Sequence, residues 1–390
     1  MLTFNDTKIS FADKSDYELR KAYWLFKTIE SPRIVSLGSK LLNFAISIKF
    51  PIKWIIKPTV FQHFCGGENI DECDNTIKKL SKSGIGTILD YSAEGIKNEA
   101  DFDKVTEELL AVIEKSINNE DIPFAVFKVT GIARFSLLEK INSKAILSES
   151  EKLEFERVKS RIEKICYAAF QNNIPVFIDA EETWIQNTID EISEDMMKKY
   201  NTHKAIVYNT LQMYRHDRMA YFEKITAEAI QHQYFIGVKV VRGAYMEKER
   251  ERAEKMNYLS PIHIDKESTD NDYNKALKFA FDNRNIISVC AGSHNEESNM
   301  LLAELIKSNN LNNKDKRFYF AQLLGMSDHI SYNLANAGYN VAKYVPYGPV
   351  NSVMPYLLRR AQENTSVAGQ TGRELLLILK ELKRRKQIKN

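Results

Sequence analysis

From about residue 84 onward, short runs of β-prone hydrophobic residues alternate with longer amphipathic segments. The longer segments repeat their hydrophobic residues with helical spacing, so the pattern predicts parallel strands joined by helices. The predicted strands are Gly86–Ser92, Phe124–Thr130, Val176–Ala180, Ala205–Leu211, Phe235–Val241, Ile286–Ala291, Arg317–Leu323 and Asn340–Tyr344. The predicted helices are Asp101–Asn118, Glu151–Gln171, Thr183–Tyr200, Met213–Gln233, Asn271–Asn283, Glu296–Asn309 and Asp328–Ala337.

Eight such strand-and-helix units predict a (β/α)8 barrel, a fold that usually takes about 250 residues before insertions. A doubly wound sheet is the alternative. No G-x-G-x-x-G follows an early strand, which argues against a Rossmann dinucleotide site. We therefore expect residues 1–60 to form an N-terminal helical arm and residues 61–390 to form a barrel catalytic domain, with a final helix over the barrel mouth.

The final helix is predicted at Pro355–Asn364, and it carries charges on one side. One helical stripe consists of Tyr356, Arg359, Arg360 and Glu363, and another face of Leu357, Leu358 and Ala361. Two adjacent guanidiniums repel each other, and an anion such as a carboxylate between them would relieve that repulsion. The alternative is a solvated arginine pair, the ordinary environment of arginine.

Polar residues stand at or just beyond the carboxyl ends of six predicted strands, where barrel enzymes assemble their sites. They are Lys128, Asp179, Gln212, Lys239, His294 and Tyr344. Singly, each has a structural explanation, such as a helix N-cap for Asp179 or a core position for His294. Jointly they favour a site. If the final helix covers the barrel mouth, Lys128 and the arginine pair would form a cationic clamp with Asp179 nearby, an arrangement that suits a small zwitterion such as an amino or imino acid.

Composition narrows the function classes. The 55 Lys and Arg against 52 Asp and Glu give a net charge of +3, too balanced for a surface that binds nucleic acid throughout. Four cysteines without metal-ligand spacing favour a reducing compartment and oppose zinc, and the start lacks a signal sequence, so we expect a cytoplasmic protein. No nucleophile with a histidine partner and no metal-ligand cluster is evident. A redox step on an organic cofactor remains, because side chains alone cannot accept a hydride.

Residues 34–56 are rich in hydrophobic residues, but Lys40, Lys49 and Lys53 interrupt the roughly 20-residue apolar run that a transmembrane helix needs. We interpret this segment as an arm packed on the main domain, and an interfacial helix on lipid is the alternative. The basic cluster at 383–386 would attract anionic headgroups, or else it is a solvated helix end that the helix dipole favours.

These residues resemble the proline dehydrogenase family, flavin-dependent (β/α)8 enzymes of proline catabolism. The resemblance covers most of the chain in the same order, and the Tyr-x-x-Arg-Arg-x-x-Glu-Asn helix is its most specific block. The matching blocks are Phe64–Glu68, Leu89–Tyr91, Phe127–Thr130, Ile178–Glu182, Val240–Tyr245, Ser293–Asn295, Leu324–Met326 and the helix at 356–364. The chain carries neither an aldehyde dehydrogenase domain nor a DNA-binding domain, so it resembles the monofunctional form.

The resemblance implies roles for individual residues. FAD would be contacted by Gln212, Lys239, Val241, Arg242, Gly243, Ser293, His294, Arg360 and Glu363. The proline carboxylate would be bound by Lys128, Arg359 and Arg360, with Asp179 near the ring nitrogen; these four are the expected catalytic residues. The proline ring would pack against Tyr245, Leu323, Tyr344 and Tyr356. A hydride would pass from the ring carbon beside nitrogen to flavin N5, leaving Δ1-pyrroline-5-carboxylate, and a membrane quinone would reoxidise the flavin, with peripheral contact at the inner membrane face.

The chain departs from the family pattern at three positions. Lys239 stands where many bacterial relatives have arginine, and Met246 stands where some have tryptophan. Tyr344 is bulky where hydroxyproline-preferring relatives are smaller, which favours proline over hydroxyproline. Glu94 is expected to pair with Arg359 as a gate. The alternatives are a hydroxyproline or other imino-acid dehydrogenase, or a barrel that binds an amino acid without catalysis.

Overall fold

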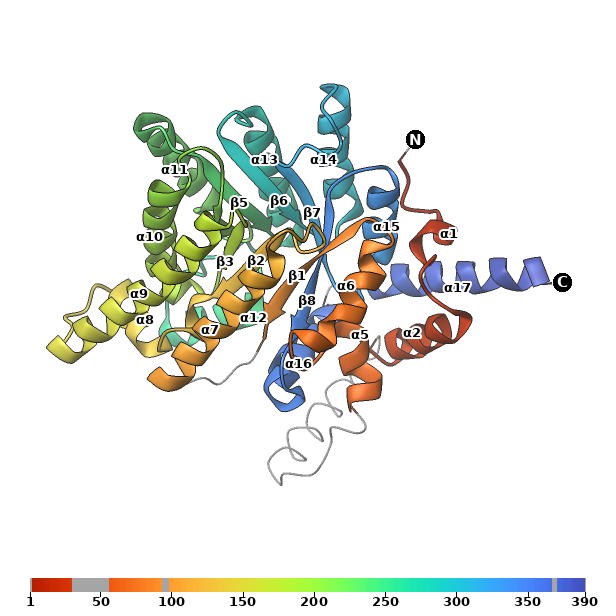
Figure 1. Cartoon of the computed structure of the whole chain (residues 1–390), viewed down its shortest axis with the longest axis horizontal. Coiled ribbons are helices and arrows are strands. Elements are labelled where there is room, and N and C mark those ends of the chain that lie inside the picture. Colours follow the sequence, from red (N-terminus) through yellow and green to blue (C-terminus); the bar gives the residue numbers. More distant parts are fainter. Residues whose placement is uncertain (1, 30–55, 93–97, 367–369, 390) are drawn as a thin grey trace. The chain divides into compact units, whose positions relative to one another are not determined.

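The chain forms a closed barrel of eight strands in sequential order, β1 to β8, with helices around it (Figure 1). The computed structural model describes residues 2–29, 56–92, 98–366 and 370–389, and side chains 360–371 lie outside this description. The predicted (β/α)8 fold is confirmed. Most of the predicted arm segment at 34–56, as well as Glu94, lies outside the described residues, so those expectations stay predictions.

The strands begin and end close to the predicted positions. They are β1 (Ile85–Tyr91), β2 (Phe124–Lys128), β3 (Val176–Asp179), β4 (Val207–Gln212), β5 (Ile236–Val241), β6 (Ile287–Gly292), β7 (Phe318–Leu323) and β8 (Val341–Tyr347). Adjacent strands pair in parallel, with Lys128 opposite Asp179 and Thr210 opposite Lys239. This register brings the carboxyl ends of β2 to β5 to one edge, which is why the predicted polar residues there become neighbours.

Helices follow the strands as predicted, with several differences. The helices are α1 (Thr7–Ser10), α2 (Asp16–Ile29), α5 (Gln62–Phe64), α6 (Asp74–Ser81), α7 (Glu99–Ser116), α8 (Phe135–Asn142), α9 (Glu149–Gln171), α10 (Thr183–Tyr200), α11 (Arg218–His232), α12 (Met246–Met256), α13 (Lys266–Asp282), α14 (Glu296–Ser308), α15 (Asp328–Asn336), α16 (Val350–Ser366) and α17 (Gln370–Lys389). The helix predicted from Met213 begins instead at Arg218, and α6, α8 and α12 were not predicted. Helix α16 extends beyond both ends of the predicted Pro355–Asn364 helix, and it is not the final helix, because α17 follows it.

The chain divides into two compact units. One consists of residues 96–321 and the other of residues 1–95 together with 322–390. In the unit of residues 96–321, helices including α7, α10, α11 and α13 pack on the outside of strands whose residues are almost all buried (Figure 1). Stacked and edge-on rings, including Phe124, Phe177 and Tyr208, fill the interior next to β2, β3 and β4. This packing fixes the strands whose ends carry polar side chains.

The unit of residues 1–95 and 322–390 joins both termini of the chain. Helices α2 and α17 run side by side (Figure 1), and Leu19 and Phe26 pack with Leu377 and Ile378. Arg385 of α17 donates to the carbonyl oxygens of Phe11 and Lys14 at 2.8 Å each. Part of the basic cluster at 383–386 therefore holds the terminal helices together.

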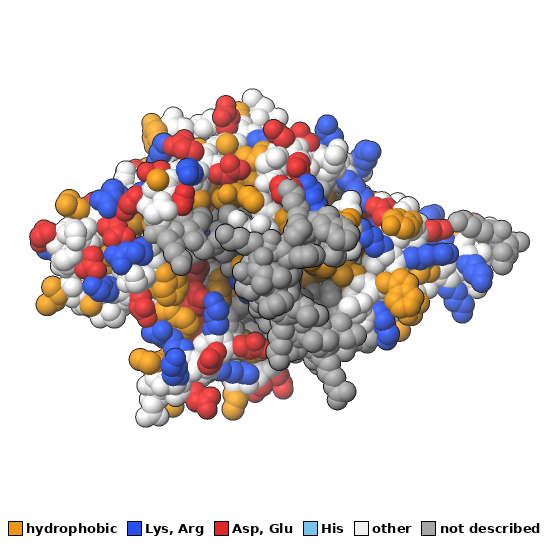
Figure 2. Space-filling model, turned by 90° about the horizontal axis from the view of Figure 1, so that it is seen from below, with side chains coloured by type: hydrophobic (Ala, Val, Ile, Leu, Met, Phe, Trp, Pro, Cys, Tyr) orange, Lys and Arg blue, Asp and Glu red, His pale blue; other side chains and the backbone are white. Residues whose placement is uncertain are grey.

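Among the described residues, no helix combines the length and the apolar character needed to cross a membrane. Lys and Arg side chains are interspersed with Asp and Glu over much of the face in Figure 2. This mixture agrees with the balanced composition.

Candidate active site at the strand ends

Two lysines meet one carboxylate at the ends of β2, β3 and β5. Lys239 donates to Asp179, and Lys128 Nζ lies 3.8 Å from the other oxygen of that carboxylate. Lys239 and Asp179 are buried, whereas the Lys128 side chain is 27% exposed. Lys239 Nζ also lies 5.3 Å from the centre of the Phe177 ring. The three charged groups together carry one net positive charge, which suits the binding of a further anion.

Gln212 connects two of the loops that follow the strands. Its Nε2 donates to the Glu181 carbonyl oxygen at 2.8 Å, and its Oε1 accepts from the Ala244 amide at 3.0 Å. Gln212 is buried, so both hydrogen bonds are made away from solvent. The side chain therefore fixes the loop after β5 against the loop after β3.

The loop after β5 requires a glycine. Gly243 has φ +150°, and a Cβ atom there would lie 2.4 Å from the ring of Tyr214. Any side chain at this position would push the loop away from Tyr214. Tyr245 closes the loop, is buried, and lies beside the ammonium of Lys248, 5.5 Å from its ring centre.

Arg242 is held rigidly beside this loop. Its guanidinium donates to Asp270 at 2.6 Å, to Ser293 Oγ at 2.6 Å and to Ser298 Oγ at 2.9 Å. It also lies over the Tyr273 ring, 4.4 Å from its centre. Burial alone would raise the pKa of Asp270, but the hydrogen bonds from Lys266 and Arg242 hold it below its usual value. A guanidinium fixed in this way is preorganised for a phosphate or carboxylate group.

The loop after β6 brings two further predicted residues into the same unit. Ser293 is buried, and its Oγ accepts from both Arg242 and the Asn295 amide. His294 is half-buried beside it in the sequence. The N-cap of α14 is Asn295, so His294 does not cap that helix.

The remaining predicted residues belong to the unit of residues 1–95 and 322–390. Tyr344 on β8 is buried and its carbonyl oxygen accepts from the Leu324 amide at 2.8 Å. Tyr356 on α16 is buried, Leu323 is partly buried against the same cluster, and the Arg359 guanidinium lies 5.9 Å from the Tyr356 ring centre. The side chains of Arg360 and Glu363 lie outside the described residues.

One carboxyl group in the site was missed as a functional residue. Glu181 accepts hydrogen bonds from the Thr130 amide at 3.0 Å and from the Thr130 hydroxyl. Burial raises the pKa of Glu181 to about 7. Because Thr130 follows Lys128 by two residues, Glu181 braces the segment that carries this lysine. The acidic run at residues 179–182 was the available signal in the sequence, but it also contains Asp179 and Glu182 and so does not single out Glu181.

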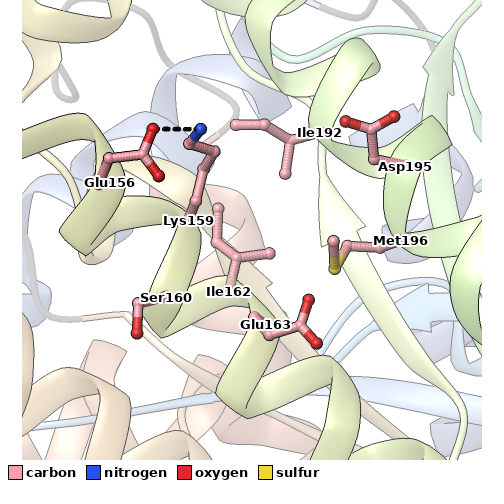
Figure 3. Close-up of a pocket in the computed structure, with 8 residues that line it drawn as sticks. All are labelled: Glu156, Lys159, Ser160, Ile162, Glu163, Ile192, Asp195 and Met196. Carbon is pink, nitrogen blue, oxygen red and sulfur yellow. Dashed lines mark ion pairs between the residues drawn. The ribbon is translucent and has the colours of Figure 1, made fainter. Parts of the chain in front are cut away.

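A pocket elsewhere in the same unit does not resemble a site. It lies between α9 and α10, has a volume of about 310 Å³ and is lined by Ile162, Ile192 and Met196 among others (Figure 3). The Glu156 and Lys159 side chains at its edge pair with each other at 2.5 Å. No predicted site residue lines it, and it does not involve a strand end.

Metal and thiol chemistry find no support in the part of the chain that the structure describes. No group of three or more metal-ligating side chains occurs among these residues. All four cysteines are buried thiols, and burial raises the pKa of Cys290 to about 12. A thiol of that kind is a poor nucleophile at neutral pH.

The fold and these strand-end groups define a (β/α)8-barrel protein with a cationic, largely buried cluster at its strand ends. Comparisons with known proteins give the family. The family model for proline dehydrogenase matches residues 73–373. Mitochondrial proline dehydrogenase 1 of Dictyostelium discoideum is 32% identical over 97% of this chain and 74% of its own length. The chain therefore belongs to the proline dehydrogenase family.

Two further similarities extend this picture. The hydroxyproline dehydrogenase of Xenopus laevis is 29% identical over 98% of this chain and 90% of its own length. The crystal structure of proline utilization A from Bdellovibrio bacteriovorus, inactivated by N-propargylglycine, is similar with a TM-score of 0.72 and 19% identity. That match covers 92% of this chain but 38% of the longer protein, and at this identity it supports the fold alone.

Proposed function

We propose that the protein is an FAD-dependent dehydrogenase that oxidises L-proline to Δ1-pyrroline-5-carboxylate, the first step of proline catabolism. The observation that carries the proposal is the cluster of buried Lys239 and Asp179 with partly exposed Lys128 at the strand ends of a chain in this family. FAD, when bound, supplies the two-electron acceptor that no side chain can provide. The side chains contribute binding and orientation.

The residues present fit such a cofactor. Arg242 is fixed by one carboxylate and two hydroxyls, next to the turn at which Gly243 packs against the Tyr214 ring. A guanidinium fixed in this way suits a phosphate-bearing group. We propose that Gln212, Lys239, Val241, Arg242, Gly243, Ser293, His294, Arg360 and Glu363 hold FAD.

We propose that Lys128, Arg359 and Arg360 bind the proline carboxylate, and that Tyr245, Leu323, Tyr344 and Tyr356 enclose the ring. Asp179 would lie near the ring nitrogen, where its charge orients the amine. Because Lys239 already engages the Asp179 carboxylate, we infer that the proton of the amine goes to water. Restricting a small substrate in this way supplies much of the rate enhancement expected from the protein.

The visible spectrum of the purified protein tests the proposal. A flavin spectrum that bleaches when L-proline is added without oxygen, and a product trapped by o-aminobenzaldehyde, would support it. D-Proline serves as the control substrate. A colourless protein, or a flavin spectrum that L-proline leaves unchanged, would refute it.

A matched pair of variants tests the cofactor residues separately. Arg242→Met should lower the flavin bound per protein severalfold, because it removes a fixed guanidinium from the proposed phosphate site. Arg250→Met is the control, since Arg250 lies on α12 and donates to the carbonyl oxygen of Ile264 at 3.1 Å on an exposed surface. Equal flavin content in both variants would contradict the assignment of Arg242.

Hydroxyproline is the second candidate substrate, and the similarity to the Xenopus laevis enzyme is the reason to test it. Tyr344 is buried in this chain, and a bulky ring there would leave less room for a hydroxyl group on the substrate. We expect kcat/KM to be higher for L-proline than for trans-4-hydroxy-L-proline. Tyr344→Ala should narrow the difference, whereas an unchanged ratio would exclude Tyr344 as its cause.

We further propose that the protein is cytoplasmic and passes its electrons to a quinone while in peripheral contact with the inner membrane face. Deleting residues 1–60 would also remove Leu19 and Phe26 from the packing with α17. Replacing Leu41, Leu42 and Phe44 with serine is therefore the sharper test, with flotation on anionic vesicles as the readout. Ile146→Ser, at a residue 96% exposed, is the control. Equal flotation of all three proteins would refute the contact.

A further inference from the structure

The loop between β7 and α15, residues 323–327, is anchored by a fully buried lysine. Lys343 on β8 has 0% exposure, and its Nζ donates to the carbonyl oxygens of Leu323, at 3.3 Å, and Met326. Lys343 also pairs with Asp328 at 2.9 Å, and Asp328 pairs with Lys14 at 2.7 Å. A buried ion pair of this kind is sensitive to geometry, so the loop has little freedom.

Helix α16 packs on this loop through its apolar face. Met326 of the loop belongs to one buried cluster with Val353, Tyr356 and Leu357 of α16, and Leu323 packs against the same cluster. Arg359 stands two positions beyond Leu357 on that helix. The position of the loop therefore determines the position of the helix that carries the arginine pair.

Helix α17 is attached to the same loop by a buried carboxylate. Glu374 accepts a hydrogen bond from the Ser327 amide, and His329 Nδ1 lies 3.8 Å from it. Glu374 is 5% exposed, and burial raises its pKa. Helix α17 also contacts α16 directly, so the attachment of α17 to the loop restrains α16 as well.

We propose that Glu374 is a positioning residue for the substrate-binding arginines: by holding α17 on the loop at residues 323–327, it fixes α16 and so the placement of Arg359 and Arg360. This inference rests on the proposed function, in which these arginines bind the carboxylate of the substrate. It assigns to α17 a part in substrate binding although none of its residues is expected to touch the substrate.

A purely structural role for Glu374 makes a different prediction, and α17 offers a matched control. Glu381 is also a buried glutamate of α17, with 0% exposure. It accepts from Arg384 and Arg385 at 2.7 Å, and Arg385 reaches the N-terminal segment rather than the 323–327 loop. Loss of Glu381 therefore weakens the docking of α17 on the N-terminal segment and removes no hydrogen bond to that loop.

The experiment compares Glu374→Ala, Glu374→Gln and Glu381→Ala in the flavin-loaded enzyme. Glu374→Ala should raise the KM for L-proline on the order of tenfold while kcat changes much less, because misplaced binding groups weaken substrate binding. Glu374→Gln retains an acceptor for the Ser327 amide and should show a smaller rise. Glu381→Ala should lower the melting temperature and leave KM within about twofold.

Two results would overturn the inference: an unchanged KM in both Glu374 variants, or an equal rise of KM in Glu381→Ala. If Glu374→Ala does not fold, Glu374→Gln alone decides between these outcomes. A second readout is the dissociation constant of cyclopentanecarboxylate, which has the carboxylate and lacks the ring nitrogen, measured by flavin absorbance. Turnover of L-proline by the wild-type protein tests the proposed function independently, so its failure is distinguishable from failure of the inference.

Discussion

Replacing Asp179 with asparagine is the sharpest test of the strand-end cluster. The change leaves the ammonium of Lys239, which is 4% exposed, without its carboxylate, and removes the partner that Lys128 approaches to 3.8 Å. Breaking a buried ion pair from one side destabilises a protein by about 3 to 5 kcal/mol. Lys128 adds less, since water reaches it and screens the interaction.

We therefore expect Asp179→Asn to lower the free energy of unfolding by about 4 kcal/mol. An unfolding entropy of about 2 cal/mol/K per residue, applied to this chain length, converts that loss into a fall of about 5 °C in melting temperature. Urea denaturation gives the free energy and thermal melting gives the temperature. Glu107→Gln is the control, because Glu107 pairs with Lys164 on the surface at 2.6 Å and should cost under about 1 kcal/mol.

A double-mutant cycle shows whether the loss comes from the pairing itself. Lys239→Met removes the buried ammonium, so Asp179→Asn combined with Lys239→Met leaves no buried charge at this pair. The double variant should be less destabilised than the sum of the two single variants by about 2 kcal/mol or more. Additive losses, or a loss below about 1 kcal/mol in Asp179→Asn, would refute the coupling of these charges.

Three further predictions concern other buried groups. Burial raises the pKa of Glu181 to about 7, so the folded state keeps a proton that the unfolded state releases above about pH 4.5. The free energy of unfolding should therefore fall by about 3 kcal/mol between pH 4.5 and 7, and Glu181→Gln should remove this dependence on pH. Burial lowers the pKa of His63 to about 4, so stability should be lost as the pH falls from about 6.5 to 4, and His63→Gln should remove that loss. Each variant is compared with the wild-type protein by urea denaturation across this pH range, and a variant whose pH profile equals that of the wild type would contradict the expectation for its residue. Gly243→Ala should be destabilised by several kcal/mol more than Gly84→Ala. Both glycines have positive φ, but an added Cβ meets the Tyr214 ring at 2.4 Å only at Gly243. Equal melting temperatures of the two variants would disprove this.

The eight strands could be predicted because each is a buried run of β-prone residues bounded by polar segments. The start of α11 could not. Residues 213–217 continue a helical pattern, yet the amides of Met213 and Tyr214 bond to the carbonyl oxygens of Val241 and Arg242 at 2.8 and 2.7 Å. Pairing with a strand distant in the sequence overrides the local preference there.

The missed helix α12 has a different cause. Its Met246–Met256 sequence is mostly charged, and Ala253 and Glu249 are its buried residues, so no hydrophobic stripe marks it. Glu249 is buried because it accepts from the Thr183 amide and hydroxyl, each at 2.7 Å. A helix that docks through a carboxylate leaves no hydrophobic periodicity for sequence reasoning to detect.

In the site, the position of each polar residue along its strand could be predicted from the sequence, but the side chain that it contacts could not. Lys128, Asp179, Gln212 and Lys239 were predicted as site residues because they stand at or near strand ends. That Asp179 is engaged by Lys239 depends on the register of strands separated by 60 positions in the sequence. Such pairings are decided by the fold and have no local signal.

The buried lysines Lys343 and Lys239, on two strands of the barrel, differ in how fully nearby carboxylates balance the charge around them. We use this difference to distinguish a structural cluster from a binding site. Lys343 and Lys14 are balanced by Asp328 and Asp13, and Lys343 donates to two carbonyl oxygens as well. A cluster that is neutral and rich in acceptors needs no ligand, so we interpret it as an anchor for the loop at residues 323–327. At the ends of β2, β3 and β5, in contrast, Lys128 and Lys239 share the charge of one carboxylate, and Lys128 is partly exposed to solvent. These three groups by themselves carry one net positive charge, which an anionic substrate or cofactor would neutralise.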